Sequence, residues 1–255
     1  MLSQEILFQE MNSAIFWIYE YVVSCNAKGV VIGNSGGKDS ATVLAMAVKA
    51  LGADKVLAVE MPCLSNPRDL EDAKLVAETF GVYSIQVDLS TPYQELEDKI
   101  QAQFEQELKL ESKVNMKPRL RMMTLYAIAQ TLDYLVIGTG NLCEAMVGYT
   151  TKWGDNSSDF NPIGNFTVSE VLEIGEYLGV PAQILQKAPN DGLGGQTDEQ
   201  KMGIRYRQIE EMIETGQTDE KAKQEILKRF QLTEHKRKLV PTYQFQRKNF
   251  LTNPL

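Results

Sequence analysis

Residues 30 to 40 combine the side chains that enzymes use to bind phosphate groups. Ser35 and Ser40 supply hydroxyl donors, Lys38 supplies a positive charge, and Asp39 supplies a carboxylate that can hold a magnesium ion beside phosphates. The glycines between them let backbone N–H groups approach a ligand closely. Because the N-terminus of a helix attracts anions, such a turn before a helix predicts a phosphate-binding loop. A tight turn that binds nothing is the simpler alternative.

The loop needs a strand before it and a helix after it, and the flanking residues supply both. Val30, Val31 and Ile32 form a β-branched run that is typical of a buried parallel strand. The apolar residues from 41 to 50 then have helical spacing, and Gly52 favours a helix end. The spacing matches neither the Walker loop, which needs Ser or Thr directly after the lysine, nor the dinucleotide fingerprint Gly-x-Gly-x-x-Gly.

Further strands follow at 55 to 61, 83 to 88 and 134 to 138. Helices are expected between them, over 68 to 80, over 92 to 112 and from Pro118 onward. This alternation predicts an α/β fold with a doubly wound parallel sheet. Ligands bind such sheets beyond the carboxyl ends of the strands, so the phosphate loop and the residues after the fourth strand should meet there.

The remaining segments surround this sheet. An amphipathic helix is expected at 4 to 24, and the segment 139 to 166 is rich in loop-forming residues. Thr167 and Glu170 form a capping box for the next helix. Residues 188 to 197 have the composition of a flexible lid. Charged helices over 198 to 214 and 218 to 230 predict a helical C-terminal extension within a single domain, 1–255.

Composition places the chain among ordinary globular proteins. It has 255 residues, 43% of them hydrophobic and 24% charged, and no apolar run long enough to span a bilayer. No secretory signal is visible, and Cys25, Cys63 and Cys143 lie too far apart for a Cys-x-x-Cys pair, which favours a cytoplasmic protein. The net charge of −8 disfavours nonspecific nucleic-acid binding but is compatible with a local basic groove.

Taken in chain order, the motifs resemble those of ammonia-dependent NAD synthetases, which belong to the ATP-pyrophosphatase superfamily with its Ser-Gly-Gly-x-Asp-Ser pyrophosphate loop. The resemblance covers most of the chain. The matching segments are 35–40, 117–122, 138–139, Glu144, 148–155, 159–162, 196–199 and 234–237.

The resemblance implies a homodimeric ligase that uses ATP and deamido-NAD as substrates and Mg²⁺ as cofactor. ATP adenylates the nicotinate carboxylate of deamido-NAD, and ammonia then displaces AMP from the NAD-adenylate, so the products are NAD, AMP and pyrophosphate. Residues 1 to 29 are too few for a glutaminase domain before the loop. Free ammonia, or ammonia from a separate partner, is therefore the expected nitrogen source.

The resemblance also implies roles for individual residues. Asp39 and Glu144 are the implied catalytic and metal-binding residues. The implied ATP-binding residues are Gly33, Asn34, Ser35, Gly36, Gly37, Lys38, Asp39, Ser40 and Thr139. The implied deamido-NAD-binding residues are Arg119, Lys152, Asp159, His235 and Lys236, and Arg121 could share their work. Each has an ordinary alternative: a solvated acid, a strand-end hydroxyl, a surface salt-bridge partner or a structural histidine.

The chain departs from the family pattern at three positions near the ATP site. Val168 stands where many members carry a lysine, and Asn190 stands where a hydroxyl is usual. Asn34 replaces an apolar residue in the loop. If ATP is held as in the family, Lys187 or Lys38 is expected to compensate.

Two other functions share this scaffold. One is another N-type ATP pyrophosphatase, but a tRNA-thiolating member would need a cysteine pair and a basic surface that this chain lacks. The other is a non-catalytic adenine-nucleotide-binding sensor, which has no need for both Asp39 and Glu144. The expected dimer interface is an apolar surface on the helix from Pro118 and the loop after strand four. Its residues are Leu120, Met123, Leu125, Ile128, Met146, Tyr149 and Trp153.

Overall fold

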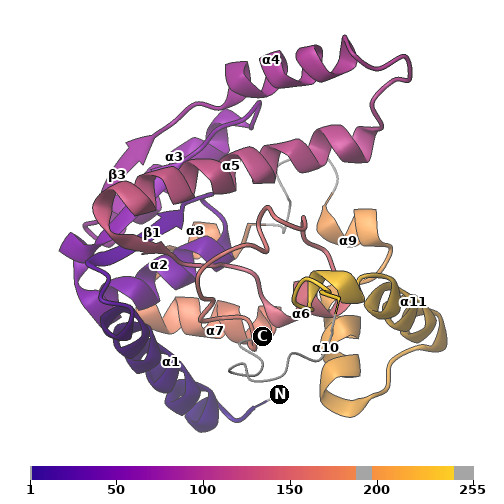
Figure 1. Ribbon diagram of the computed structural model, residues 1–255. Helices are drawn as coiled ribbons and strands as arrows, with labels where there is room; N and C mark the ends of the chain where they lie inside the picture. The colour runs from indigo at the N-terminus through magenta and orange to yellow at the C-terminus, as the bar shows by residue number, and fades with distance from the viewer. Residues whose placement is uncertain (1, 188–196, 244–255) are drawn as a thin grey trace, which may run out of the picture.

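A parallel sheet forms the centre of the protein in a computed structural model that describes residues 2–187 and 197–243 (Figure 1). Its four strands lie in the order β3-β2-β1-β4, so the chain moves outward from β1 and then crosses back to its other side. The predicted doubly wound α/β fold is confirmed, and its switch point lies beside the strand that leads into the phosphate loop. The strands are β1 (Gly29–Gly33), β2 (Val56–Glu60), β3 (Tyr83–Gln86) and β4 (Tyr134–Val136).

Helices cover both faces of the sheet because successive side chains of a strand point to opposite sides. Val30 and Ile32 pack into one apolar core with the first helix layer, and Val31 packs into the second core on the other face. The first layer contains α1 (Gln4–Ser24), α2 (Lys38–Leu51), α3 (Pro67–Thr79), α7 (Val168–Leu178) and α8 (Ala182–Leu185). The second contains α4 (Ser90–Gln101) and α5 (Leu110–Leu132).

The C-terminal part is helical, as predicted, and has an apolar cluster of its own. Ile209 and Ile226 of this part are fully buried against Cys143 and Val147, which follow the fourth strand. The helix that carries both of these residues, α6 (Leu142–Val147), therefore joins the sheet to the C-terminal part. The C-terminal helices are α9 (Asp198–Met202), α10 (Tyr206–Thr215) and α11 (Glu220–Leu232), followed by the short 3₁₀ helix η2 (Glu234–Lys236).

Three helix predictions are wrong in their limits. The single helix predicted over 92 to 112 is two helices, because the Gln101 side chain bonds the backbone of Phe104, Gln106 and Leu108 and stabilises a turn. Pro118 does not begin a helix but lies inside α5. The helix predicted over 198 to 214 is interrupted at Gly203, which ends α9 with a φ of +69°.

Leu120 and Leu125 do not belong to an exposed surface. Both are buried in the core between α5 and the sheet, whereas Met123 and Trp153 are 64% and 57% exposed. The capping box of Thr167 and Glu170 is confirmed. The predicted lid over 188 to 197, including Asn190, lies outside the described residues except for Thr197. No helix in the described part of the chain has the length and apolar character needed to cross a membrane.

Candidate functional site

The phosphate loop connects β1 to α2 and leads directly into the N-terminus of that helix. Gly37 caps α2 without a side-chain hydrogen bond, so the first N–H groups of this helix are not blocked by a capping side chain. Gly36 has a φ of +70°, and a Cβ there would lie 2.5 Å from the carbonyl oxygen of Asp69. Ser35 and Ser40 exchange a hydroxyl hydrogen bond of 3.0 Å. The loop is thus a tight anion cradle packed against α3.

Asn34 fastens this loop to its neighbours. Its Nδ2 donates to the carbonyl of Ala73 in α3 (2.7 Å) and to Oε1 of Glu60 at the end of β2 (3.4 Å). Its Oδ1 accepts a 3.4 Å hydrogen bond from the N–H of Gly36. Asn34 is 3% exposed, so its amide is a buried polar group whose burial is offset by these hydrogen bonds.

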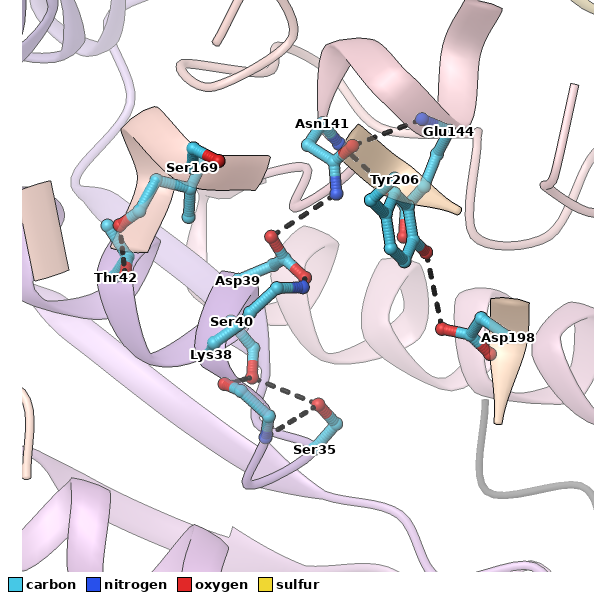
Figure 2. A network of polar contacts seen from close by, with 12 residues as sticks. Ser35, Lys38, Asp39, Ser40, Thr42, Asn141, Glu144, Ser169, Asp198 and Tyr206 are labelled. Carbon is cyan, nitrogen blue, oxygen red and sulfur yellow. Dashed lines mark hydrogen bonds and ion pairs between the residues drawn. The ribbon is translucent and has the colours of Figure 1, made fainter. Parts of the chain in front are cut away.

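Two carboxylates from opposite sides of the switch point meet beside the loop (Figure 2). Nζ of Lys38 pairs with Oδ2 of Asp39 at 2.6 Å, and Nδ2 of Asn141 donates to Oδ1 of Asp39 at 3.3 Å. The backbone N–H of Asn141 donates to Oε2 of Glu144 at 3.0 Å. Burial, and then the nearby charge of Asp39, raises the pKa of Glu144. The site therefore favours an added cation.

These groups line a cavity of about 1020 Å³ that extends from the loop across the carboxyl ends of the strands. Of the residues expected to bind ATP, Gly36 alone does not line it, because this glycine is packed against α3. Thr139 lines the cavity from the end of β4. The expected ATP-binding residues that line the cavity are Gly33, Asn34, Ser35, Gly37, Lys38, Asp39, Ser40 and Thr139. Glu144, expected as a metal ligand, lines it as well.

The family model of the NAD synthases matches residues 10–249, nearly the whole chain. The chain belongs to the NAD synthase family. The NH₃-dependent NAD⁺ synthetase of Carboxydothermus hydrogenoformans is 42% identical over 91% of this chain and 96% of its own length.

Solved structures of NAD synthase relatives agree with this assignment. The NMN synthetase of Francisella tularensis has a TM-score of 0.89 and 36% identity, over 96% of this chain and all of the other. The NH₃-dependent NAD synthetase of Campylobacter jejuni has a TM-score of 0.76 and 28% identity, over 93% and 99% of the two chains. The similarity therefore extends over the full catalytic scaffold of these proteins.

The residues matched to deamido-NAD in the NAD synthase family are only partly assembled in this chain. Lys236 lines the cavity, where its Nζ donates to the carbonyls of Gly148 (2.7 Å) and Thr150 (2.5 Å). Arg119, Lys152 and His235 lie outside the cavity lining and contact one another. Nε of Arg119 donates to the Lys152 carbonyl at 3.2 Å, and Nζ of Lys152 lies 3.4 Å from Nδ1 of His235. We call these four residues the basic rim.

Asp159 is separate from the basic rim. Its carboxylate accepts hydrogen bonds from the N–H of Val136 (2.7 Å) and from the hydroxyl of Tyr126 (3.3 Å), so it holds the end of β4. It does not line the cavity. Within the described part of the chain, Asp159 forms no hydrogen bond or ion pair with the four residues of the rim. A role in substrate binding by Asp159 stays a prediction.

Sequence analysis assigned no role to three side chains that complete the site, although Asp198 lies in the matched segment 196–199. Asn141 links Asp39 to Glu144, and the Asn-x-x-Glu spacing of a capping box was the signal for it. Tyr206 and Asp198 reach the site from the C-terminal helices. No local pattern marked Tyr206, because its neighbours in the site are far away in the sequence.

The structure also locates the departures from the NAD synthase pattern. Val168 is buried in the apolar cluster of the C-terminal part and does not line the cavity. Lys187 does line it, and its Nζ lies 2.7 Å from both Oδ1 of Asp69 and Oδ2 of Asp72. Arg121 lines the cavity and is half-buried there, where its Nε donates to the Met61 carbonyl at 3.0 Å. Lys187 therefore lies at the cavity with its charge paired to two carboxylates, and its role in holding ATP stays a prediction.

The side-chain oxygens that lie at the switch point between β1 and β4 suit a Mg²⁺ ion. Asp39 and Glu144 offer the carboxylate oxygens that this hard cation prefers. No cluster of three or more acidic, histidine or cysteine side chains that could hold a metal is found among the described residues. A magnesium ion there would complete its coordination with phosphate oxygens and water, as it commonly does in nucleotide sites.

Proposed function

We propose that this chain catalyses the ATP-dependent amidation of deamido-NAD by ammonia, giving NAD, AMP and pyrophosphate through an NAD-adenylate. One observation carries the proposal: in a chain matched by the NAD synthase model, Asp39 and Glu144 meet beside the phosphate loop in one cavity. A non-catalytic sensor would not need two partly buried carboxylates there. The cavity is also large enough for a nucleotide and a second substrate to lie side by side.

The proposed roles follow from the geometry. The loop N–H groups, Ser35, Lys38 and Ser40 bind the phosphates that leave as pyrophosphate, and Thr139 contacts ATP from the end of β4. Asp39 and Glu144 would hold Mg²⁺, which supplies charge stabilisation when the nicotinate carboxylate attacks the α-phosphorus. Asn141 holds both carboxylates in place. The basic rim supplies cations for the dinucleotide, whose pyrophosphate and carboxylate are negative.

Ammonium, but not glutamine, is expected to support NAD formation. The reason is that the chain spans 96% of a relative named as NH₃-dependent and shows no glutaminase pattern. Purified protein would be supplied with ATP, Mg²⁺ and deamido-NAD, and NAD and pyrophosphate would be measured with either nitrogen source. NAD formation from glutamine alone would contradict the prediction. Pyrophosphate release without NAD would favour a different ATP pyrophosphatase.

A second candidate acceptor is the corresponding mononucleotide. The structure with a TM-score of 0.89 to this chain is that of an NMN synthetase, and the amide bond implied by that name forms on the same nicotinate carboxyl group. Comparing kcat/KM for nicotinate mononucleotide and deamido-NAD in the same assay decides between the two acceptors. A higher kcat/KM for nicotinate mononucleotide would identify the mononucleotide, and not deamido-NAD, as the preferred substrate.

A homodimer is the proposed assembly. The supporting features are exposed apolar side chains on α5, after α6 and on α1, together with a substrate site that is divided between the cavity, the basic rim and Asp159. The exposed residues are Phe16, Trp17, Val23, Met123 and Trp153. We expect light scattering to give twice the 28.7 kDa chain mass, and Met123→Glu to shift the protein toward monomer with loss of deamido-NAD binding. A fully active monomer would contradict this prediction.

We also propose that residues 1–255 act as one domain in the cytoplasm. The three cysteines are free thiols, with Cys63 and Cys143 buried, which suits a reducing compartment.

A further inference from the structure

Tyr206 reaches the phosphate site from the C-terminal part, and the proposed reaction gives it no role. It lies at the first position of α10, is 5% exposed, and its ring centroid is 5.8 Å from Nζ of Lys38. Figure 2 shows its hydroxyl directed at Asp198. The ring therefore packs against the loop lysine, although it does not itself line the cavity.

The orientation of this ring is fixed by three elements. The Tyr206 hydroxyl donates to Oδ2 of Asp198 at 3.3 Å, and its backbone N–H donates to Oε1 of Glu199 at 2.8 Å. Oδ1 of Asp198 accepts a 3.2 Å hydrogen bond from the hydroxyl of Tyr149, which follows α6. Asp198 itself is 6% exposed. Residues from α9, α10 and the end of α6 therefore hold one aromatic face toward Lys38.

Lys38 is a buried cation whose position needs such a support. Its side chain is 7% exposed, and among the described residues Asp39 is the one carboxylate within ion-pair distance. The 2.6 Å ion pair with Oδ2 of Asp39 keeps this ammonium charged. A cation is attracted by an aromatic face, more strongly when both are out of water.

Substrate binding changes what surrounds this ammonium. In the proposed reaction Asp39 and Glu144 would hold Mg²⁺ and the phosphates would lie beside Lys38, so the ammonium would no longer have the Asp39 carboxylate to itself. The ring of Tyr206 is uncharged, so it can stay in contact with the ammonium without competing with the phosphates for it. We propose that Tyr206 is a positioning residue whose ring keeps the Lys38 ammonium directed at the phosphates of ATP. This inference rests on the proposed function.

Substitutions that separate the ring from the hydroxyl test the inference. The dissociation constant of a non-hydrolysable ATP analogue would be measured by calorimetry with Mg²⁺. Tyr206→Phe keeps the ring and is expected to stay within about twofold of the parent, whereas Tyr206→Leu should weaken binding about tenfold. Tyr177→Leu is the matched control, because that ring lies 5.6 Å from Nζ of Lys49 on the surface and should have no effect.

Steady-state kinetics distinguish positioning from general damage. In Tyr206→Leu the KM for ATP should rise while the KM for deamido-NAD stays within about twofold. If this variant does not melt cooperatively, Tyr206→Met fills a similar volume without a ring and takes its place. Equal losses in the Phe and Leu variants, equal rises in both KM values, or unchanged ATP affinity would each overturn the inference. Failure of the parent to bind the analogue would instead overturn the proposed function.

Discussion

Asp39→Asn is expected to lower kcat by about 100- to 1000-fold while the protein stays folded. The substitution removes a carboxylate from the position where Mg²⁺ and the phosphates would meet but keeps the shape of the side chain. It removes the ion pair of Lys38 and at the same time the repulsion of Glu144. These two effects oppose each other, so the free energy of unfolding should change by about 1 kcal/mol or less. Turnover at saturating ATP and thermal melting are the measurements.

Asp133→Asn is the matched control for this experiment. Asp133 ends α5 in a left-handed conformation that asparagine also adopts, and its ion pair with Lys28 is exposed to solvent. Activity and melting temperature should both be retained in this variant. If Asp39→Asn melted normally and turned over at the parent rate, Asp39 would not be a ligand of the catalytic metal.

Gly36→Ala is expected to lower the free energy of unfolding by about 2–4 kcal/mol and to weaken ATP binding more than tenfold. A methyl group there would lie 2.5 Å from the carbonyl oxygen of Asp69 and 2.7 Å from the backbone nitrogen of Ala73. Neither backbone atom can move without shifting α3. The φ of +70° adds conformational strain of about 1–2 kcal/mol. Chemical denaturation and calorimetric ATP titration would measure the two effects.

Gly203→Ala is the control that separates the cost of a positive φ from the cost of a steric clash at position 36. Gly203 has nearly the same φ, +69°, but a Cβ there would meet no atom within 4 Å. Its substitution should cost only the conformational strain, about 1–2 kcal/mol, and leave ATP affinity unchanged. Equal losses of stability in the two variants would show that the packing of the loop against α3 does not constrain position 36.

The parts of the fold that sequence predicted correctly are those with strong local patterns. The β-branched run at Val30, the alternation of strands and helices, and the capping box at Thr167 each need only neighbouring residues to be recognised. Pro118 shows the limit of this approach. Proline usually begins a helix, but here α5 continues through it. Pro118 cannot donate a hydrogen bond to the carbonyl of Val114, one turn earlier, and Val114 lies in the wall of the cavity.

The candidate site divides in the same way. The phosphate loop is contiguous, and its cavity lining was predicted except for the packed glycine at 36. Tyr206 meets Lys38 only because α10 folds back over the loop, and no sequence spacing carries that information. Asp159 was assigned from a resemblance, but its carboxylate holds β4 in the structure. Contacts made by the C-terminal helices and by strand ends could therefore not be predicted from local sequence patterns and became visible only in the structure.

The buried amide at position 34 has a consequence for how this loop can change over evolutionary time. An apolar residue at position 34 would leave the Ala73 carbonyl and one oxygen of Glu60 without that donor, at about 1–3 kcal/mol for each buried group. Changing Glu60 first removes part of that penalty, because Asn34 keeps its bond to Ala73. Neutral drift from asparagine to the apolar residue is therefore easier after Glu60 has changed than before. The order of mutations, and not only their sum, decides which loop sequences this lineage can reach.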